Sequence, residues 1–205
     1  MQSKYRLTMA ALFFAALAAF PLLGLDFYNE MISRIVILAL FAVSLDLLVG
    51  YSGLISFGHA AWFGIGGYTF ALVSTQYKLS NSLWVTMPAA LIVTALLSAL
   101  IGLLVLRTKG LYFIMVTLAL AQVFFFLFHD VPIIGGSTDG INLYTAPDAT
   151  IGGLDVLNLG NPTILYYFIL ATLAAALILI SILLRSPFGH AIQGIKENEH
   201  RMKSI

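Results

Sequence analysis

Six long apolar stretches dominate this 205-residue chain, and the segments between them are polar or rich in glycine. A helix that crosses the hydrocarbon core of a membrane needs roughly 20 mostly apolar residues. The chain is 60% hydrophobic and 9% charged, whereas a soluble domain is nearer ~45–50% apolar and ~25% charged. This composition argues against a cytosolic enzyme, a nucleic-acid binder and a disordered chain. We predict an all-α, polytopic membrane protein in which 1–205 form one transmembrane domain. The expected spans are 7–25, 31–49, 60–77, 83–106, 111–128 and 163–184.

The basic residues predict how these spans are oriented. If the N-terminus lies in the cytoplasm and the chain crosses six times, both termini lie inside and only Lys78 falls in an outside loop. Arg34 then lies near an outer helix end. Clustering of basic residues on alternate loops is what the positive-inside rule expects, and an odd number of spans would break it. The residues placed inside are Lys4, Arg6, Arg107, Lys109, Arg185, Lys196, Arg201 and Lys203.

The break between the fifth and sixth spans, residues 129–162, is long and full of turn-forming residues. We expect an external loop there, with short strands around residues 151–159. The first apolar stretch follows Lys4 and Arg6, as in a signal peptide, but it stays apolar well past its small residues, to Leu25. We therefore expect a membrane span rather than a cleaved peptide.

A glycine-rich segment, GYSGLISFGHAAWFGIGGY (50–68), stands between the second and third spans. Glycine lets helices approach closely, so composition favours a tight helix crossing with a cytoplasmic turn. The alternative is an interrupted helix that lines a substrate path, because non-helical backbone within a membrane must face protein or water. The polar groups of such a path would be Ser52, Ser56 and His59, although a histidine in this setting is more often a packing residue.

Ionisable residues within spans are costly and often functional. Asp46, toward the cytoplasmic end of the second span, is predicted to cap or brace the glycine-rich turn rather than to relay protons. Arg34 is expected to extend outward along its helix. In the fifth span, Thr117 and Gln122 either face the path or bond to neighbouring helices. The candidate translocation path therefore consists of Asp46, Ser52, Ser56, His59, Thr117 and Gln122.

The C-terminal segment, residues 185–205, predicts a short amphipathic helix outside the bilayer. Ser186 followed by Pro187 is a favourable helix start, and apolar residues then recur at helical spacing among charges of both signs. One interpretation is an interfacial helix on lipid headgroups. Anionic lipid would repel Glu197 and Glu199, however, which favours a helix that docks into a groove on a partner protein.

Four segments resemble, in order, the motifs of the branched-chain amino acid ABC-importer permeases. They are GYSGLISFGHAAWFGIGGY, TKGLYFIMVTLALAQ (108–122), GGSTDGI (135–141) and RSPFGHAIQGIKENEHRMKSI (185–205). The long external segment is more similar to the M-type permease subunit than to its H-type partner. Relatives commonly carry an uncharged amide near Asp46 and continue beyond residue 205 with further spans, so this sequence is expected to be truncated.

The resemblance implies a permease subunit of an ATP-driven importer in a bacterial inner membrane. Its expected partners are two ABC ATPase subunits, a second permease subunit, an extracytoplasmic binding protein that delivers substrate, and membrane lipid, with no nucleic acid. Hydrolysis would lie on the ATPases, since this chain has no Walker motif, and no catalytic residue, metal or cofactor is expected here. By position, the ATPase-coupling residues would be Arg185, Gly189, Ala191, Ile195, Glu197, Asn198 and Glu199.

Other substrates and other function classes stay open at this point. Relatives carry leucine, isoleucine and valine, but also other amino acids, urea, amides and aromatic acids. An ion-coupled secondary transporter or channel would use Asp46 and His59 and would need no docking helix or ATPase partner. An intramembrane enzyme would use His59 and His129, but these stand in separate segments without the HExxH spacing of a metal site.

Overall fold

Helices make up most of the computed structural model, which describes residues 2–23, 26–77, 80–131, 134, 140–141, 147–151 and 154–202. Short 3-10 or π-helical turns extend three of the helices. The helices and strands are α1 (Gln2–Ala19), η1 (Phe20–Leu23), α2 (Asp26–Asp46), η2 (Leu47–Tyr51), α3 (His59–Ala71), η3 (Leu72–Gln76), α4 (Leu83–Val105), α5 (Leu111–Asp130), β1 (Ala149–Ile151), β2 (Leu154–Leu157), α6 (Pro162–Arg185) and α7 (Pro187–Met202).

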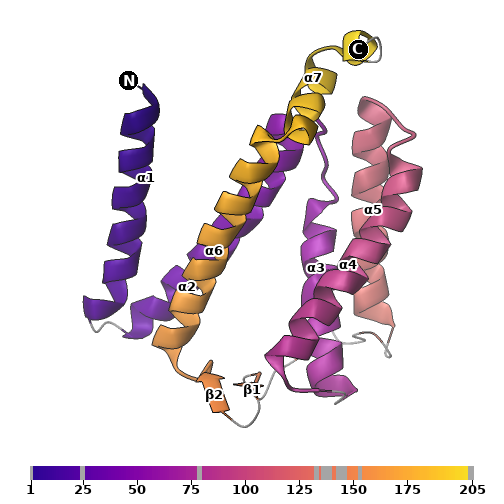
Figure 1. Cartoon of the computed structure of the whole chain (residues 1–205). Coiled ribbons are helices and arrows are strands. Elements are labelled where there is room, and N and C mark those ends of the chain that lie inside the picture. Colours follow the sequence, from indigo (N-terminus) through magenta and orange to yellow (C-terminus); the bar gives the residue numbers. More distant parts are fainter. Residues whose placement is uncertain are drawn as a thin grey trace.

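The long helices form two groups that run side by side (Figure 1). One group is the α2–α6 pair, with α1 beside it, and the other is α3 packed against α4 and α5. The helix α7 lies at one end of the bundle, called here the α7 end. The strands β1 and β2 lie at the opposite end, called here the hairpin end.

The core of the first group lies between α2 and α6. Val36 from α2 packs there with Tyr166, Leu170 and Leu173 from α6, and all four are buried. The Tyr166 hydroxyl donates a hydrogen bond of 2.7 Å to the Leu17 carbonyl, which joins the end of α1 to α6. These contacts make α2 and α6 a packed unit to which α1 is attached.

The two groups meet at the hairpin end and, away from it, where Ser44 of α2 bonds to His59 of α3. Near the hairpin, Leu83 of α4, Ala149 of β1 and Leu159 form a small buried cluster. The Leu83 amide donates to the Asp148 carbonyl (2.8 Å), which joins the start of α4 to the segment between α5 and α6. The antiparallel pairing of β1 with β2 confirms the short strands expected in this segment.

Four helices in the described parts of the chain are long and apolar enough to cross a membrane. They are Tyr28–Tyr51, Leu83–Val105, Leu111–Asp130 and Pro162–Arg185. An all-α, polytopic membrane protein is therefore confirmed as the fold class, and the many exposed large apolar side chains suit a surface that faces lipid.

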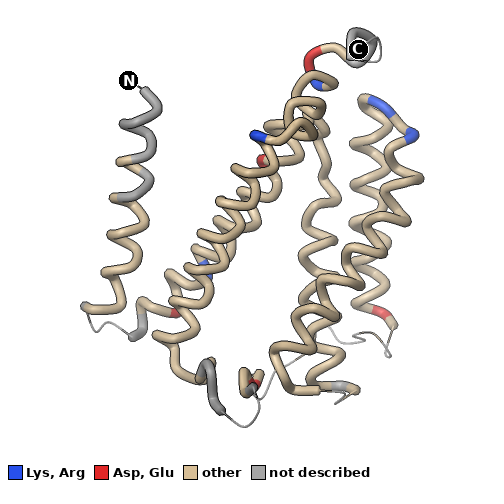
Figure 2. The backbone as a smooth tube through the Cα atoms, in the orientation of Figure 1, with Lys and Arg blue, Asp and Glu red and all other residues tan. Residues whose placement is uncertain are grey.

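The first and third expected spans have a different form. In α1 the apolar stretch is the shorter Leu12–Leu22, and α3 is a 13-residue helix that continues into the π-helical turn η3. A total of six spans, with both termini inside, stays a prediction. Figure 2 supports the orientation, since Lys and Arg gather mainly at the α7 end.

The α7 helix begins as Ser186 and Pro187 predict. The Ser186 hydroxyl donates to the Leu183 carbonyl (2.6 Å) and accepts from the Gly189 amide (3.3 Å), so it closes both sides of a sharp elbow between α6 and α7. Gly189 is buried in this elbow, where an added Cβ would lie 2.6 Å from the Leu184 Cα. The sequence did not predict the kink at Asn198, whose φ of −159° and ψ of 101° interrupt α7.

Replacing Gly189 with alanine is expected to destabilise the elbow, because the new methyl group overlaps backbone atoms that cannot move independently. Overpacking of this kind costs about 1–3 kcal/mol. Thermal unfolding of the purified protein in detergent should show a lower midpoint for Gly189→Ala. Gly67→Ala is the matched control, because a Cβ at Gly67 meets no atom within 4 Å. Equal midpoints for the two variants would contradict the proposed close packing.

Candidate functional site

The glycine-rich segment contains a break in helical structure, residues 52–58, called here the glycine connection. The break follows the π-helical turn η2. The Ser52 amide donates to the Leu47 carbonyl (3.3 Å) and the Leu54 amide to the Leu48 carbonyl (3.2 Å). Gly53 has a φ of +73°, which side-chain-bearing residues rarely adopt, and it turns the chain out of the helix. The glycine connection is therefore an ordered bridge between α2 and α3.

The C-terminal end of the glycine connection, where it leads into α3, contacts α5 and α2. The Phe57 amide donates to the Thr117 hydroxyl (3.3 Å), and Gly58 sits so close to α5 that an added Cβ would lie 2.8 Å from the Thr117 carbonyl oxygen. His59 then opens α3, with its Nε2 atom 2.8 Å from the Ser44 hydroxyl and its ring 5.0 Å from the ring of Phe41. Three helices thus meet at this point.

The N-terminal end of the glycine connection, where it follows η2, contacts Lys196 of α7. Its ammonium group donates to the Gly50 carbonyl, which lies at the C-terminal end of η2. The stem of Lys196 lies on Gly53, where an added Cβ would come within 2.9 Å of the Lys196 Cγ. The last carbonyls of a helix lack intrahelical partners, and a cation is favourable beside them. Sequence reasoning missed Lys196 as a site residue, because its partner lies 146 positions away.

Asp46 lies against the same helix end. The Asp46 carboxylate lies close over Gly50, with its Cγ 3.0 Å from the position of a Cβ there, so a side chain at position 50 would require the carboxylate to turn aside. The Asp46 side chain makes no capping hydrogen bond to η2. It lines a cavity of about 390 Å³ between α2 and α6, together with Tyr51, Ser181 and Arg185. The bracing role and the proton-relay role of Asp46 both stay predictions.

The other candidate path residues lie around separate cavities. Ser56 and Thr117 share one of about 170 Å³, where α4 and α5 meet the glycine connection. Ser52 lines another of about 440 Å³ at the α7 end, together with Ile195 and Lys196. Gln122 lines a third, of about 460 Å³. The structure thus brings Ser56 and Thr117 together and leaves Ser52 and Gln122 apart from them.

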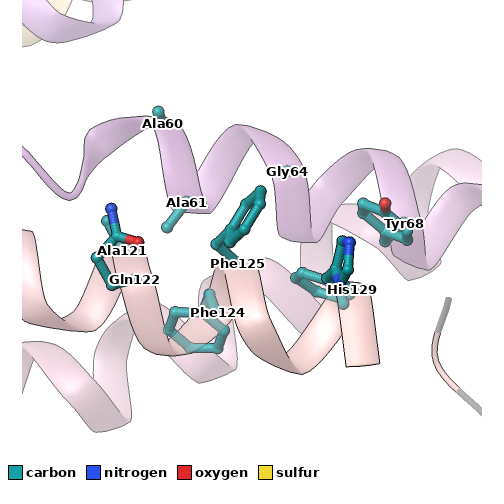
Figure 3. A pocket seen from close by; sticks show the side chains of 10 residues that line it. Ala60, Ala61, Gly64, Tyr68, Ala121, Gln122, Phe124, Phe125 and His129 are labelled. Atoms are coloured by element: carbon teal, nitrogen blue, oxygen red, sulfur yellow. The ribbon is translucent and has the colours of Figure 1, made fainter. Parts of the chain in front are cut away.

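The cavity beside Gln122 is a groove between α3 and α5 (Figure 3). Aromatic side chains line most of its length, and Tyr68 stacks on Phe128 with ring centroids 4.3 Å apart. His129 lies at the Tyr68 end of the groove. Since Tyr68 is nine residues along α3 from His59, about 13 Å at 1.5 Å per residue, the two histidines do not form one site. This separation disfavours the intramembrane enzyme.

The predicted coupling residues lie along the α6–α7 elbow and α7. Arg185 ends α6 and is exposed, Gly189 is buried within the elbow, and Ala191 is half-buried. Ile195 is 51% exposed, and Phe188, which was not among the coupling candidates, is 62% exposed. Glu197 and Asn198 are exposed at the kink, and the side chain of Glu199 lies outside the described residues. The exposed residues of α7 thus include both apolar and charged side chains.

Comparison with known proteins gives the family. A family profile described as "Branched-chain amino acid transport system / permease component" matches residues 27–205. The "High-affinity branched-chain amino acid transport system permease protein LivM" of Salmonella typhimurium and that of Escherichia coli are each 28% identical over 220 residues, covering 98% of this chain and 51% of each relative. The chain therefore spans about half the length of these relatives, and no solved structure matches it. Because the match includes the glycine connection and α7, this chain belongs to the branched-chain amino acid transport permease family.

Proposed function

We propose that this chain is a transmembrane permease subunit of an ATP-driven importer for branched-chain or related amino acids in a bacterial inner membrane. The family match over residues 27–205 is the observation that carries the proposal. In this assembly a second permease subunit completes the path, two ABC ATPase subunits drive it, and an extracytoplasmic binding protein delivers substrate. Hydrolysis takes place on the ATPase subunits, and this chain converts their movement into opening of the path.

The α7 helix is the element that meets the ATPase subunits. It lies at the end of the bundle where basic residues gather, which the positive-inside rule assigns to the cytoplasm. Phe188 and Ile195 expose apolar surface there, and Glu197 is also exposed. An exposed apolar face of this kind suits the groove of a partner protein, as in other helix-in-groove contacts.

Movement of α7 reaches the bundle through the glycine connection. Lys196 fastens α7 to Gly50, and the opposite end of the connection is fastened to Thr117 of α5 and, through His59, to Ser44 of α2. A displacement of α7 therefore pulls on a short ordered segment that touches α2, α3 and α5. A movement caused by the ATPase subunits can therefore pass from α7 to the membrane helices through a chain of direct contacts.

The competing proposal, an ion-coupled carrier that uses Asp46 and His59, has less support. Asp46 lines the cavity between α2 and α6, whereas His59 is paired with Ser44 and packed on Phe41. A carrier that works without an ATPase partner also does not require an exposed docking helix such as α7. The permease of an ATP-driven importer accounts for both features.

Loss of the docking face should remove the ATPase subunits. The double variant Ile195→Asp with Glu197→Ala places a charge on the exposed apolar surface of α7 and removes the exposed carboxylate of Glu197. Burying an unpaired charge is strongly unfavourable, so we expect the ATPase subunits no longer to copurify with the permease and ATP-driven leucine uptake to cease.

The matched control is Leu111→Asp, an exposed apolar residue at the start of α5, outside α7. This variant should keep the ATPase subunits. Normal copurification and uptake in the α7 double variant would refute the role of α7 as the docking helix.

Loss of the Lys196 contact should uncouple hydrolysis from transport. Lys196→Met keeps the length of the side chain but removes the donor to the Gly50 carbonyl. A charge-assisted hydrogen bond contributes about 1.5 kcal/mol, so we expect transport per ATP hydrolysed to fall by about tenfold. The ATPase subunits should still copurify and hydrolyse ATP, and Lys196→Arg should restore most of the coupling.

Lys109→Met is the control, since Lys109 lines the same cavity at the α7 end but is not the donor to the Gly50 carbonyl. Coupling should be normal in this variant. If Lys196→Met transports with the wild-type ratio of substrate to ATP, the glycine connection is not the route from α7 into the bundle.

A further inference from the structure

A cavity of about 330 Å³ lies near the hairpin end between α2 and the segment that leads into α6. Its volume is at the lower end of the range for small-ligand sites, about 300–1,000 Å³. From α2 it is lined by Glu30, Ser33, Arg34 and Ile37, and its opposite wall includes Leu165 and Ile169 of α6. It is distinct from the cavities that contain the candidate path residues.

The charged groups at this cavity have no partners among the described residues. Neither Arg34 nor Glu30 makes an ion pair there. Arg34 lies within the apolar helix Tyr28–Tyr51, six residues or about 9 Å from its start. Both side chains are exposed and line the cavity, so a ligand can reach their charged groups.

The same turns of α2 contain a further polar side chain that lacks a partner. Asn29 is 1% exposed, and both polar atoms of its side-chain amide are unpartnered within the described parts of the chain. Ser33, one turn later, is also buried, and its hydroxyl donates to the Asn29 carbonyl (2.8 Å). Ser33 lines the cavity together with Glu30 and Arg34, whereas Asn29 is next to Glu30 in the chain but does not line the cavity.

Glu30 and Arg34 stand four residues apart, so they share one helix face with Cβ atoms about 5–6 Å apart. A carboxylate and a guanidinium at that spacing match the ammonium and carboxylate groups that an α-amino acid carries on one carbon. The rest of the wall, with Ile37, Leu165 and Ile169, is apolar and suits a branched hydrocarbon side chain.

We propose that this cavity is a binding site for the zwitterion of a branched apolar amino acid, with Arg34 on its carboxylate, Glu30 on its ammonium group and the apolar wall around its side chain. The proposal rests on the proposed function, because this cavity would be the place where the transported amino acid first binds to this chain. A guanidinium and a carboxylate form charge-assisted bonds, which are about twice as strong as neutral ones. The site recognises the two charged groups that all α-amino acids share and selects among them by the shape of its apolar wall.

Two other occupants are less consistent with the cavity. An anionic lipid headgroup would pair with Arg34 but would be repelled by Glu30. A direct pair between Glu30 and Arg34 would satisfy both charges and leave no site, but no such ion pair is present among the described residues. The arrangement of two unpaired opposite charges favours a ligand that carries both.

The test is equilibrium binding of labelled leucine to the assembled transporter in phosphatidylcholine nanodiscs, without the binding protein. The competitors are leucine, leucinamide, which lacks the carboxylate, and 4-methylpentanoate, which lacks the ammonium group. The wild-type assembly should prefer leucine to each analogue by about tenfold or more. Arg34→Met should lose the preference over leucinamide and keep that over 4-methylpentanoate, and Glu30→Gln should show the reverse pattern.

A purely structural role for these residues would not produce this crossed pattern, and Arg34→Lys should keep both preferences. Ile169→Ala should weaken leucine binding, whereas Ile178→Ala, on an exposed face of the same helix, should not. The site is overturned if wild-type binding of leucine is not saturable, or if both charge variants keep both preferences or lose them together. It is also overturned if phosphatidylglycerol displaces leucine from the wild type but not from Arg34→Met, since the occupant is then a lipid.

The proposed function has a separate readout, ATP-driven uptake of leucine, isoleucine and valine by the complete system with its binding protein. Absence of that uptake in the wild type would refute the transport assignment. Normal wild-type uptake together with an unchanged competition pattern in Arg34→Met would refute the site alone.

Discussion

The glycine connection places the strongest constraint on this bundle, because non-helical backbone among membrane helices must find partners within the protein. Its amides and the carbonyls beside it do so through groups from η2, α5 and α7. The Leu47 carbonyl of η2 accepts from Ser52, Thr117 accepts from Phe57, and Lys196 donates to Gly50. Each of these bonds also fixes the position of a helix. The break between α2 and α3 is thus the place where α2, α5 and α7 are joined.

The glycines of this region act through close approach more than through flexibility. At Gly58 the backbone of the connection meets the backbone of α5, and at Gly53 it meets the stem of Lys196. Larger side chains would force α5 or α7 away and lengthen the bonds that hold them. Composition favoured a tight helix crossing, and the alternative was an interrupted helix. The described segment has features of both, with an interrupted backbone whose interruption is closely packed.

Hydropathy predicted the long helices well, because burial in lipid depends on the length of an apolar run, which can be counted in the sequence. The start of α7 was also predictable, since Ser186 and Pro187 act locally. The π-helical turns, the kink at Asn198 and the contact of Lys196 with Gly50 were not predictable, because they depend on neighbours distant in sequence. For the same reason the sequence could name Ser56, Thr117 and Gln122 as polar groups but could not tell that Gln122 faces a different cavity.

The α2–α6 pair links the two ends of the molecule where function is proposed. Its outer part borders the cavity with Glu30 and Arg34, and its inner part bears α7, attached to α6 through the elbow at Gly189 and to α2 through Lys196. Between these ends, Val36 and Tyr166 belong to a buried core that resists sliding of one helix along the other. Because both attachments of α7 are on the same packed pair, a force on α7 moves the pair as a unit. In the proposed transport cycle, the cavity with Glu30 and Arg34, whose walls come from α2 and from α6 with the segment before it, would move with this pair.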